Sequence, residues 1–270
     1  MSRLVLVGNS HVLALQQGYG QRPAAIASNS AGGLEVAFCW VRGETPEAPG
    51  DGTIWRTTSD GFTWEQTSFW YEPLVELVEA ADCIAVQWGG GWMGHRALIA
   101  RGAEFDVMLP ESATDQEQIV GEVIPYSAVA EFAWSKISGN GRVARLMDLC
   151  EEVRPRKLAI LGPPPPLPTE AVRERLPDSR WFVDRAQELG IRLEDVPIVG
   201  DATRIKLWRV MYDVYRMFGA QHGATLLEPP ASVFDTSGAL RSEFWGNDVL
   251  HANAEYGWRY LERVLQWAAE

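Results

Sequence analysis

The seven-residue stretch LVLVGNS, at positions 4–10, indicates the fold class. Four consecutive branched apolar residues that end in a glycine turn are typical of a strand buried on both faces of a sheet. Beyond Ser10, the apolar residues Val12, Leu13 and Leu15 begin a helical pattern. A strand, a tight turn and a helix in this order indicate an α/β fold.

The rest of the chain repeats this alternation of buried strands and helices. Short apolar runs recur at 34–41, 83–88, 157–161 and 224–227. The clearest helical patterns, with apolar residues every three or four positions, lie at 71–80, 143–153, 204–218 and 255–268, and Gly139 and Gly219 punctuate two helical stretches. Such a pattern predicts a three-layer α/β/α fold of the flavodoxin-like kind, with a mainly parallel central sheet.

Two segments fit this scheme poorly, about 43–69 and about 92–126. The first is rich in Gly, Pro, Thr and Trp, and the second mixes glycines and acidic residues with a few apolar pairs. We expect both to be loop-like insertions in a single domain of residues 1–270. The proline run at 163–166 follows a predicted strand directly and is interpreted as a stiff exit from the sheet.

Composition excludes several classes of partner. The formal net charge is −12, without a dense Lys/Arg block, which argues against nucleic acid. No apolar run reaches the roughly 18–20 residues of a membrane span, and the run at 4–7 is too short for a signal peptide. The three cysteines lack metal-ligand spacing, and their odd number cannot pair fully. We expect a reduced, cytoplasmic protein that does not bind membranes, and the oligomeric state stays open.

Ser10 lies where the first strand ends and the first helix begins. Unpaired N–H groups and the helix dipole favour developing negative charge at such a point, which suits a nucleophile. A serine at this position is also an ordinary helix N-cap. The local sequence leaves both interpretations open.

A carboxylate and an imidazole, Asp248 and His251, stand three residues apart just before the last predicted helix. A carboxylate at this spacing can hold an imidazole in one tautomer, as a general base requires. An aspartate capping a turn beside a surface histidine gives the same pattern. The signals from Ser10 and from this pair reinforce each other, because loops at the carboxyl ends of parallel strands gather at one edge of a sheet.

These residues resemble the sequence blocks of the SGNH, or GDSL-like, serine hydrolases. The stretch GNSH at 8–11 resembles the Gly-Asp-Ser-Leu block of the family, and Asp248-x-x-His251 with NAEYG at 253–257 resembles its C-terminal block. The two blocks bracket almost the whole chain. The resemblance implies an SGNH-hydrolase fold and a triad in which Ser10 attacks, His251 is the general base and Asp248 orients that base.

The resemblance also implies an oxyanion hole. Its donors would be backbone N–H groups of Ser10, of Gly32 or Gly33, and of the glycine turn that ends at Gly91. The family has an asparagine in this third block, where Gly91 stands here. Because loss of a side-chain donor from an oxyanion hole typically costs about 10²–10³ in rate, the change matters.

Three explanations of the missing asparagine stay open. The backbone of the glycine turn takes its place, Gln87 or His95 supplies a donor, or catalysis has decayed. The turn also has a structural interpretation, since three glycines let the strand bend into the following insertion.

Other departures from the family lie beside the nucleophile. Asn9 stands where the family has aspartate, and it keeps most side-chain hydrogen bonds but not the charge. His11 replaces the leucine. We expect Asn9, His11, Trp92 and His95 to border the substrate pocket, although a histidine near a glycine turn is also commonly satisfied by its neighbours.

The predicted function is cleavage of a small acyl ester through an acyl-enzyme. Acetyl on a carbohydrate is the first substrate to consider, because the family includes such esterases and tryptophans such as Trp55, Trp64 and Trp70 can stack on sugars. The same tryptophans can equally pack the insertion. The alternatives are a non-catalytic protein that binds a glycan or an acylated ligand, and an acyltransferase that uses the same triad. No cofactor and no metal are expected, since no metal or phosphate-loop motif occurs.

Overall fold

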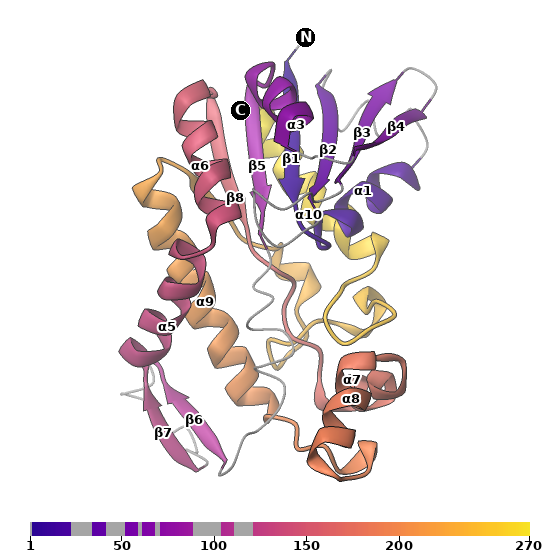
Figure 1. Cartoon of the computed structure of the whole chain (residues 1–270), viewed down its shortest axis with the longest axis vertical. Coiled ribbons are helices and arrows are strands. Elements are labelled where there is room, and N and C mark those ends of the chain that lie inside the picture. Colours follow the sequence, from indigo (N-terminus) through magenta and orange to yellow (C-terminus); the bar gives the residue numbers. More distant parts are fainter. Residues whose placement is uncertain are drawn as a thin grey trace.

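The computed structural model describes residues 2–22, 34–41, 52–58, 61–67, 71–88, 104–110 and 121–270 (Figure 1). The strands are β1 (Arg3–Gly8), β2 (Glu35–Val41), β3 (Gly52–Thr58), β4 (Gly61–Thr67), β5 (Cys83–Gln87), β6 (Phe105–Met108), β7 (Glu122–Pro125), β8 (Lys157–Leu161) and β9 (Thr225–Leu227). The α-helices are α1 (Val12–Gly20), α3 (Tyr71–Glu79), α5 (Tyr126–Ser138), α6 (Gly141–Val153), α7 (Thr169–Arg175), α8 (Arg180–Leu189), α9 (Asp201–Gln221) and α10 (Ala254–Ala269). Short 3₁₀ turns occur at Leu176–Asp178, Leu193–Asp195, Ala231–Val233 and Ser242–Phe244.

The central sheet has the strand order β4-β3-β2-β1-β5-β8-β9. The strands β2, β1, β5, β8 and β9 are parallel, while β3 and β4 extend the sheet as an antiparallel hairpin. The next parallel strand in the chain, β2, lies on one side of β1, and the later parallel strands β5, β8 and β9 lie on its other side. This is the flavodoxin-like order, with a topological switch point between β1 and β5.

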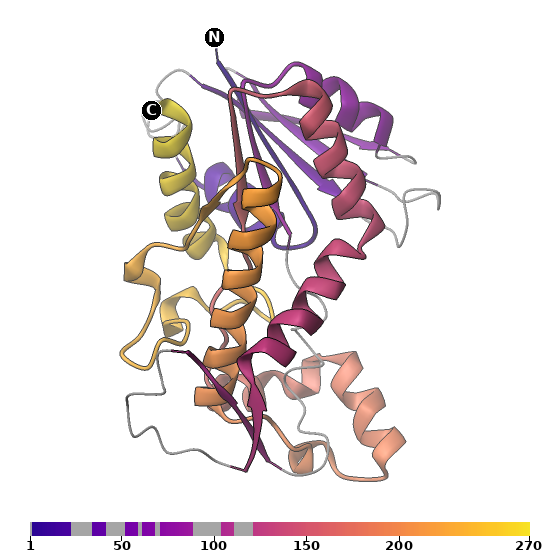
Figure 2. The same cartoon turned by 90° about the vertical axis from the view of Figure 1, so that its left-hand side faces the viewer.

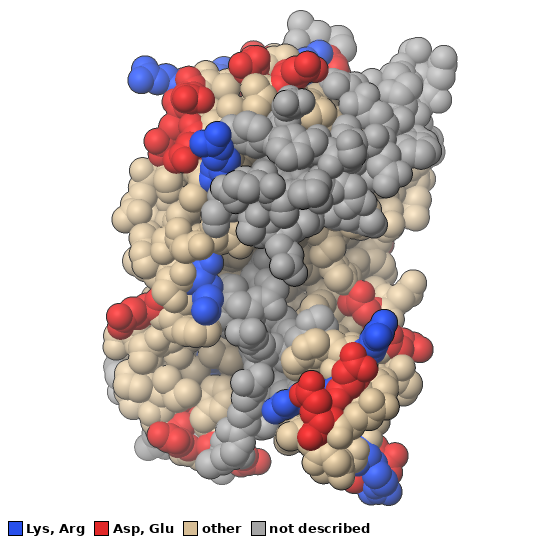
Figure 3. Space-filling view, viewed as in Figure 1, with Lys and Arg blue, Asp and Glu red and all other residues tan. Residues whose placement is uncertain are grey.

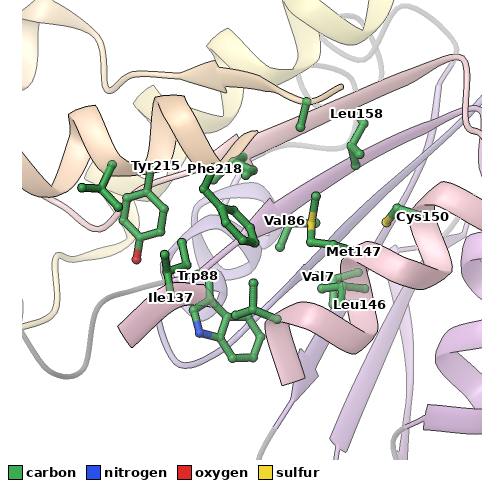
Figure 4. Packing of buried hydrophobic residues seen from close by; sticks show 14 of the residues in the cluster. Val7, Val86, Trp88, Ile137, Leu146, Met147, Cys150, Leu158, Tyr215 and Phe218 are labelled. Atoms are coloured by element: carbon green, nitrogen blue, oxygen red, sulfur yellow. The ribbon is translucent and has the colours of Figure 1, made fainter. Parts of the chain in front are cut away.

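Helices cover both faces of the sheet, which gives the predicted three layers (Figure 2). Alternate residues of β1 enter two hydrophobic cores, Leu4 and Leu6 on one face and Val5 and Val7 on the other. The first core is completed by α1, α7, α8 and α10, and the second by α3, α5, α6 and α9. Figure 4 shows the second core, where Trp88 packs with residues of α5, α6 and α9. The five parallel strands therefore carry apolar residues on both faces, as the sequence predicted.

The expectation of loop-like insertions is wrong for their described parts. The first insertion contains β3 and β4, whose pairing sets Trp55 opposite Trp64. Threonine and aromatic residues favour strands, which accounts for the hairpin, whereas the glycines and prolines of the same segment are also typical of loops. The second insertion contains β6 and β7, which form a separate two-stranded parallel sheet. Four-residue strands are too short to show a hydrophobic period.

A further difference concerns the end of α9. The sequence suggested a stop at Gly219, but the helix continues to Gln221 and is capped by His222. Gly219 lies against β8 and the carbonyl of Ala224, where a side chain would be crowded. This glycine is therefore used for close packing inside the helix and not to end it.

Charged side chains of both signs are interspersed on the face shown in Figure 3. Among the described residues, ion pairs across short sequence distances include Arg192 with Asp195 and Arg185 with Glu188. Within the described ranges, no helix combines the length and the apolar character that crossing a bilayer requires.

Candidate active site

Ser10 sits in the turn between β1 and α1, at the carboxyl edge of the sheet. The turn needs glycine before it, because a Cβ on Gly8 would lie 2.1 Å from the carbonyl oxygen of Gln87 on β5. Backbone bonds from Val12 to Asn9 (3.0 Å) and from Leu13 to Ser10 (3.2 Å) start the helix. The N-cap position falls on His11, without a side-chain cap. The structure therefore does not use the Ser10 hydroxyl as a helix cap.

Asp248 organises the loop that carries His251. Its Oδ1 accepts the backbone N–H groups of Leu250 and His251, both at 2.8 Å. Its Oδ2 lies 2.7 Å from Nδ1 of the His251 ring. A short aspartate side chain that bonds backbone groups two and three residues ahead is a recurrent turn device. Here the same carboxylate also fixes the orientation of the imidazole.

The surroundings keep Asp248 ionised. Burial by itself would raise the pKa of this carboxyl group, but the hydrogen bond and the charge of His251, together with the two backbone N–H groups, outweigh burial and hold the pKa well below its usual range. The ionised form can accept hydrogen bonds only. A carboxylate in this position therefore favours the tautomer of His251 that carries its proton on Nδ1.

The other ring nitrogen of His251 meets Ser10, with 2.7 Å between Nε2 and Oγ. The two residues are 241 positions apart in the chain. They are brought together by the packing of α1 against α10, which touch through Gly18 and Gly257. A Cβ on Gly257 would lie 1.8 Å from the carbonyl oxygen of Ala14, so this approach requires glycine.

The ring of His11, the residue after Ser10, lies beside the ring of His251. The two ring centroids are 4.8 Å apart, with 42° between the ring planes. Burial and the nearby charge of His251 lower the pKa of His11 to about 3, although Asp248 acts in the opposite direction. His11 is therefore neutral at physiological pH and presents an uncharged ring beside the imidazole.

A cavity of about 660 Å³ opens beside Ser10, His11, Asp248 and His251. Its other described lining residues are Leu13, Ala14, Leu15, Gln17, Gln21, Gln87, Pro164, Gly246, Asn247, Ala252, Asn253, Ala254, Glu255, Tyr256 and Tyr260. The volume lies in the range of small-molecule sites. The described lining carries both polar and apolar side chains.

The remaining site predictions have different outcomes. His11 lines the cavity, whereas Asn9 is not among the described lining residues, and its Oδ1 lies 3.3 Å from the backbone nitrogen of His11 as an acceptor. The place of Asn9 at the border of the substrate pocket stays a prediction. The other predicted oxyanion-hole and pocket residues, Gly32, Gly33, Gly91, Trp92 and His95, lie outside the described residues.

Gln87 reaches the cavity, and its role as a donor of the oxyanion hole stays a prediction. Its Nε2 donates to the carbonyl of Gly162 at 3.1 Å, so the amide is held by the exit of β8. Tyr260 and Pro164 also line the cavity and were not predicted. The proline run after β8 was the available sequence signal for Pro164, while Tyr260 is one of many apolar positions of α10 and carries no distinguishing pattern.

In the described part of the chain, no group of three His, Cys, Asp or Glu side chains is placed to hold a metal ion. Cys39, Cys83 and Cys150 are buried and form no disulfide in the described part of the chain. Burial, with Glu151 adding to it, raises the pKa of Cys150 to about 12. Ser10, His251 and Asp248 at the sheet edge are therefore the candidate site that the described residues offer.

The fold and this site define an α/β protein with a hydrogen-bonded serine, histidine and aspartate at the carboxyl edge of a parallel sheet. No known family model matches the chain, and no curated protein is similar enough to count as a match.

Solved structures do resemble the chain at low sequence identity. The periplasmic domain of a lipopolysaccharide acetyltransferase from Salmonella ser. Paratyphi A is 9% identical, with a TM-score of 0.48 over 99% of this chain and 84% of that one. A carbohydrate acetylesterase family member from Sinorhizobium meliloti is 14% identical, with a TM-score of 0.44 and 99% of both chains covered. A putative arylesterase from Agrobacterium tumefaciens str. C58 is also 14% identical, with a TM-score of 0.40 over 100% of this chain and 98% of that one. At such TM-scores a likeness does not establish a function, so the chemistry has to be inferred from the side chains.

Proposed function

We propose that the protein is a serine hydrolase of the SGNH type that cleaves a small acyl ester. The observation that carries the proposal is the continuous chain of contacts from Ser10 through His251 to Asp248 beside an open cavity. A nucleophile in contact with a base, and a base in contact with a third group that orients it, are the defining relations of nucleophilic catalysis by serine.

The mechanism assigns one role to each residue. The Nδ1–H of His251 donates to Asp248, which leaves the lone pair of Nε2 directed at the Ser10 hydroxyl. As Ser10 Oγ attacks the ester carbonyl, its proton passes to Nε2, and the imidazolium then protonates the leaving alcohol. The resulting acyl-enzyme is released when water, activated by the same base, attacks the acyl carbon.

The developing oxyanion needs donors fixed before the reaction. Ser10 lies at the N-terminus of α1, and its own N–H makes no hydrogen bond to another described residue. This N–H is the donor that we assign from the described part of the chain. The proposal adds Gly32 or Gly33 and the turn ending at Gly91 as further donors, because the resemblance to the SGNH blocks implies them.

An activity-based probe tests the proposal directly. A fluorophosphonate reacts only with an activated serine, so the native protein should be labelled and the Ser10→Ala variant should not. Ser135→Ala is the matched control, since the hydroxyl of Ser135 only bonds the carbonyl of Phe132 on the exposed surface of α5. Labelling that survives Ser10→Ala, or no labelling of the native protein, would refute the assignment of the nucleophile.

The same probe separates the non-catalytic alternative, which predicts no labelling. Transfer to an acceptor other than water passes through the same acyl-enzyme. It is distinguished by supplying a competing alcohol after acylation and measuring whether the acyl group is found on that alcohol or in solution as the free acid.

A further inference from the structure

The cavity beside Ser10 extends along one face of α1. Four of its lining residues, Leu13, Ala14, Gln17 and Gln21, recur at three- and four-residue spacing and therefore share that face of the helix and its C-cap. At a rise of about 1.5 Å per residue, Leu13 and Gln21 are about 12 Å apart along the helix. The cavity therefore has its nucleophile near one end and room for an extended group along α1.

A second wall of the cavity is formed by the loop that carries His251 and by the first turn of α10. Asn247 and Asn253 of the loop line the cavity, and so does Glu255 of the helix. An ion pair between Glu255 and Arg22, the residue after Gln21, joins the two walls. The general base and the face of α1 therefore border the same space.

The proposed reaction decides which half of an ester can lie in this space. Nε2 of His251 accepts the proton of the Ser10 hydroxyl and then donates it to the oxygen of the leaving alcohol. The leaving oxygen has to come within hydrogen-bond reach of Nε2, while the acyl group stays on the carbonyl carbon that Ser10 attacks. The alcohol therefore meets the residues that surround His251.

His11 adds a polar contact on the same side. Its ring lines the cavity, and its centroid lies 4.8 Å from that of His251. Among the described residues its ring nitrogens have no hydrogen-bond partner, whereas its backbone N–H is bonded to Asn9. A neutral imidazole offers one donor and one acceptor. The ring can therefore contact the alcohol without a positive charge that would oppose the imidazolium of His251.

We infer that the cavity along α1 is the subsite for the alcohol part of the ester, and that Leu13 and Gln17 determine which alcohols are accepted. This inference rests on the proposed ester hydrolysis at Ser10. It specifies the substrate class as esters whose alcohol is the larger part. Because Leu13 and Ala14 are apolar and Gln17 and Gln21 are polar, the face of α1 suits an alcohol with both apolar and hydrogen-bonding parts.

The test compares two pairs of esters in variants that narrow the cavity. The first pair, 4-phenylphenyl acetate and phenyl acetate, shares the acyl group and differs in the alcohol. The second pair, 4-nitrophenyl hexanoate and 4-nitrophenyl acetate, shares the alcohol and differs in the acyl group. In Leu13→Trp and in Gln17→Trp the kcat/KM ratio of the first pair, larger over smaller ester, should fall about tenfold or more, because the indole occupies the space of the second ring. The ratio of the second pair should stay as in the native protein.

Gln16→Trp is the matched control, since it makes the same substitution one residue earlier on α1, and Gln16 is not among the described lining residues. It should leave both ratios as in the native protein. Circular dichroism reports whether each variant is folded. Gln17 is exposed and Leu13 is half-buried, so Gln17→Trp keeps the test decisive if Leu13→Trp does not fold. An unchanged ratio of the first pair in the folded variants, or a fall confined to the second pair, would overturn the inference.

A binding measurement separates this inference from the proposed hydrolysis. The Ser10→Ala variant cannot form an acyl-enzyme, so equilibrium dialysis with 4-phenylphenyl acetate reports binding alone. Adding Gln17→Trp to Ser10→Ala should weaken that binding about tenfold or more, and adding Gln16→Trp should not. If this loss is seen but the native protein neither hydrolyses an ester nor reacts with a fluorophosphonate, the cavity stands as the binding site and the hydrolase proposal fails. If the native protein is labelled at Ser10 but neither binding nor the first ratio responds to Gln17→Trp, the hydrolase proposal stands and the alcohol subsite is refuted.

Discussion

Replacement of Asp248 by asparagine removes one contact of the triad and preserves the others. The side-chain oxygen of asparagine can still accept the N–H groups of Leu250 and His251, which Oδ1 of the aspartate accepts at 2.8 Å. The change falls on the 2.7 Å contact between Oδ2 and Nδ1 of His251. Asparagine presents an NH₂ group there, so Nδ1 becomes an acceptor and the ring proton moves to Nε2.

The consequence for catalysis follows from the position of Ser10. A proton on Nε2 points at the Ser10 oxygen, 2.7 Å away, and this nitrogen can no longer take the serine proton. We expect Asp248→Asn to lower kcat for a simple ester by about 10³–10⁴, the scale of a base held in the wrong tautomer. The unfolding midpoint should change little, because the backbone hydrogen bonds of the turn are kept.

The assay is steady-state hydrolysis of an aryl acetate by the native and Asp248→Asn proteins, with unfolding followed by circular dichroism. Asp235→Asn is the matched control, since Asp235 bonds the backbone of its own turn at Ser237 (2.8 Å) and Ala239 (3.0 Å) and does not line the cavity. Its kcat should equal that of the native protein. A loss in Asp248→Asn of less than about tenfold, with the fold intact, would show that Asp248 does not set the tautomer of the base.

Three further predictions concern the stability of the fold. Gly257→Ala forces a methyl group onto a backbone carbonyl of α1, so we expect the free energy of unfolding by urea to fall by at least about 3 kcal/mol. Gly200→Ala is the control, because a methyl group there enters open space, and its free energy of unfolding should stay within about 1 kcal/mol of the native value. The pKa of His11 is 6.5 in the unfolded chain and about 3 in the folded protein. As the pH falls below 6.5, the unfolded chain therefore takes up a proton on His11 before the folded protein does, and the free energy of unfolding decreases. His11→Leu should therefore lose about 1–2 kcal/mol less than the native protein between pH 7 and pH 5 in urea titrations, and equal losses in both proteins would contradict the lowered pKa. In the native protein, Nζ of Lys206 lies 2.9 Å from the buried carboxylate of Asp106. Lys206→Met leaves that carboxylate without its cation and should lower the free energy of unfolding by about 3–5 kcal/mol. The double variant Lys206→Met with Asp106→Asn should recover part of this loss, and no recovery would contradict the importance of the pair.

The parallel strands were predictable because burial on both faces leaves a local signature. In β1, β5 and β8 nearly every residue is apolar, and each run is bounded by a turn or a helix. The hairpin of β3 and β4 was not predicted, since Thr- and Gly-rich composition is shared by loops and edge strands. The strands β6 and β7 have four residues each and depend on a partner that is distant in sequence.

The three residues of the triad were also identifiable in advance, but only as two separate weak patterns. Asp248 and His251 are local to each other, and the turn chemistry of aspartate makes their contact predictable from spacing. The 2.7 Å contact with Ser10 spans almost the whole chain. It depends on the strand order and on the glycine contact between α1 and α10, neither of which a local pattern contains.

The sequence by itself therefore pointed to the serine, histidine and aspartate of the candidate site and to the kind of layers that carry them, because hydrophobic period and turn preference act over a few residues. Only the tertiary structure decided how each polar atom is used. Gln87 was a possible donor from sequence, and the fold places one of its two amide hydrogens on the carbonyl of Gly162 and leaves Oε1 without a hydrogen-bond partner among the described residues. Whether a buried atom finds a partner depends on neighbours that the fold brings from distant parts of the chain, and hydrogen bonding is directional enough that this placement decides the role.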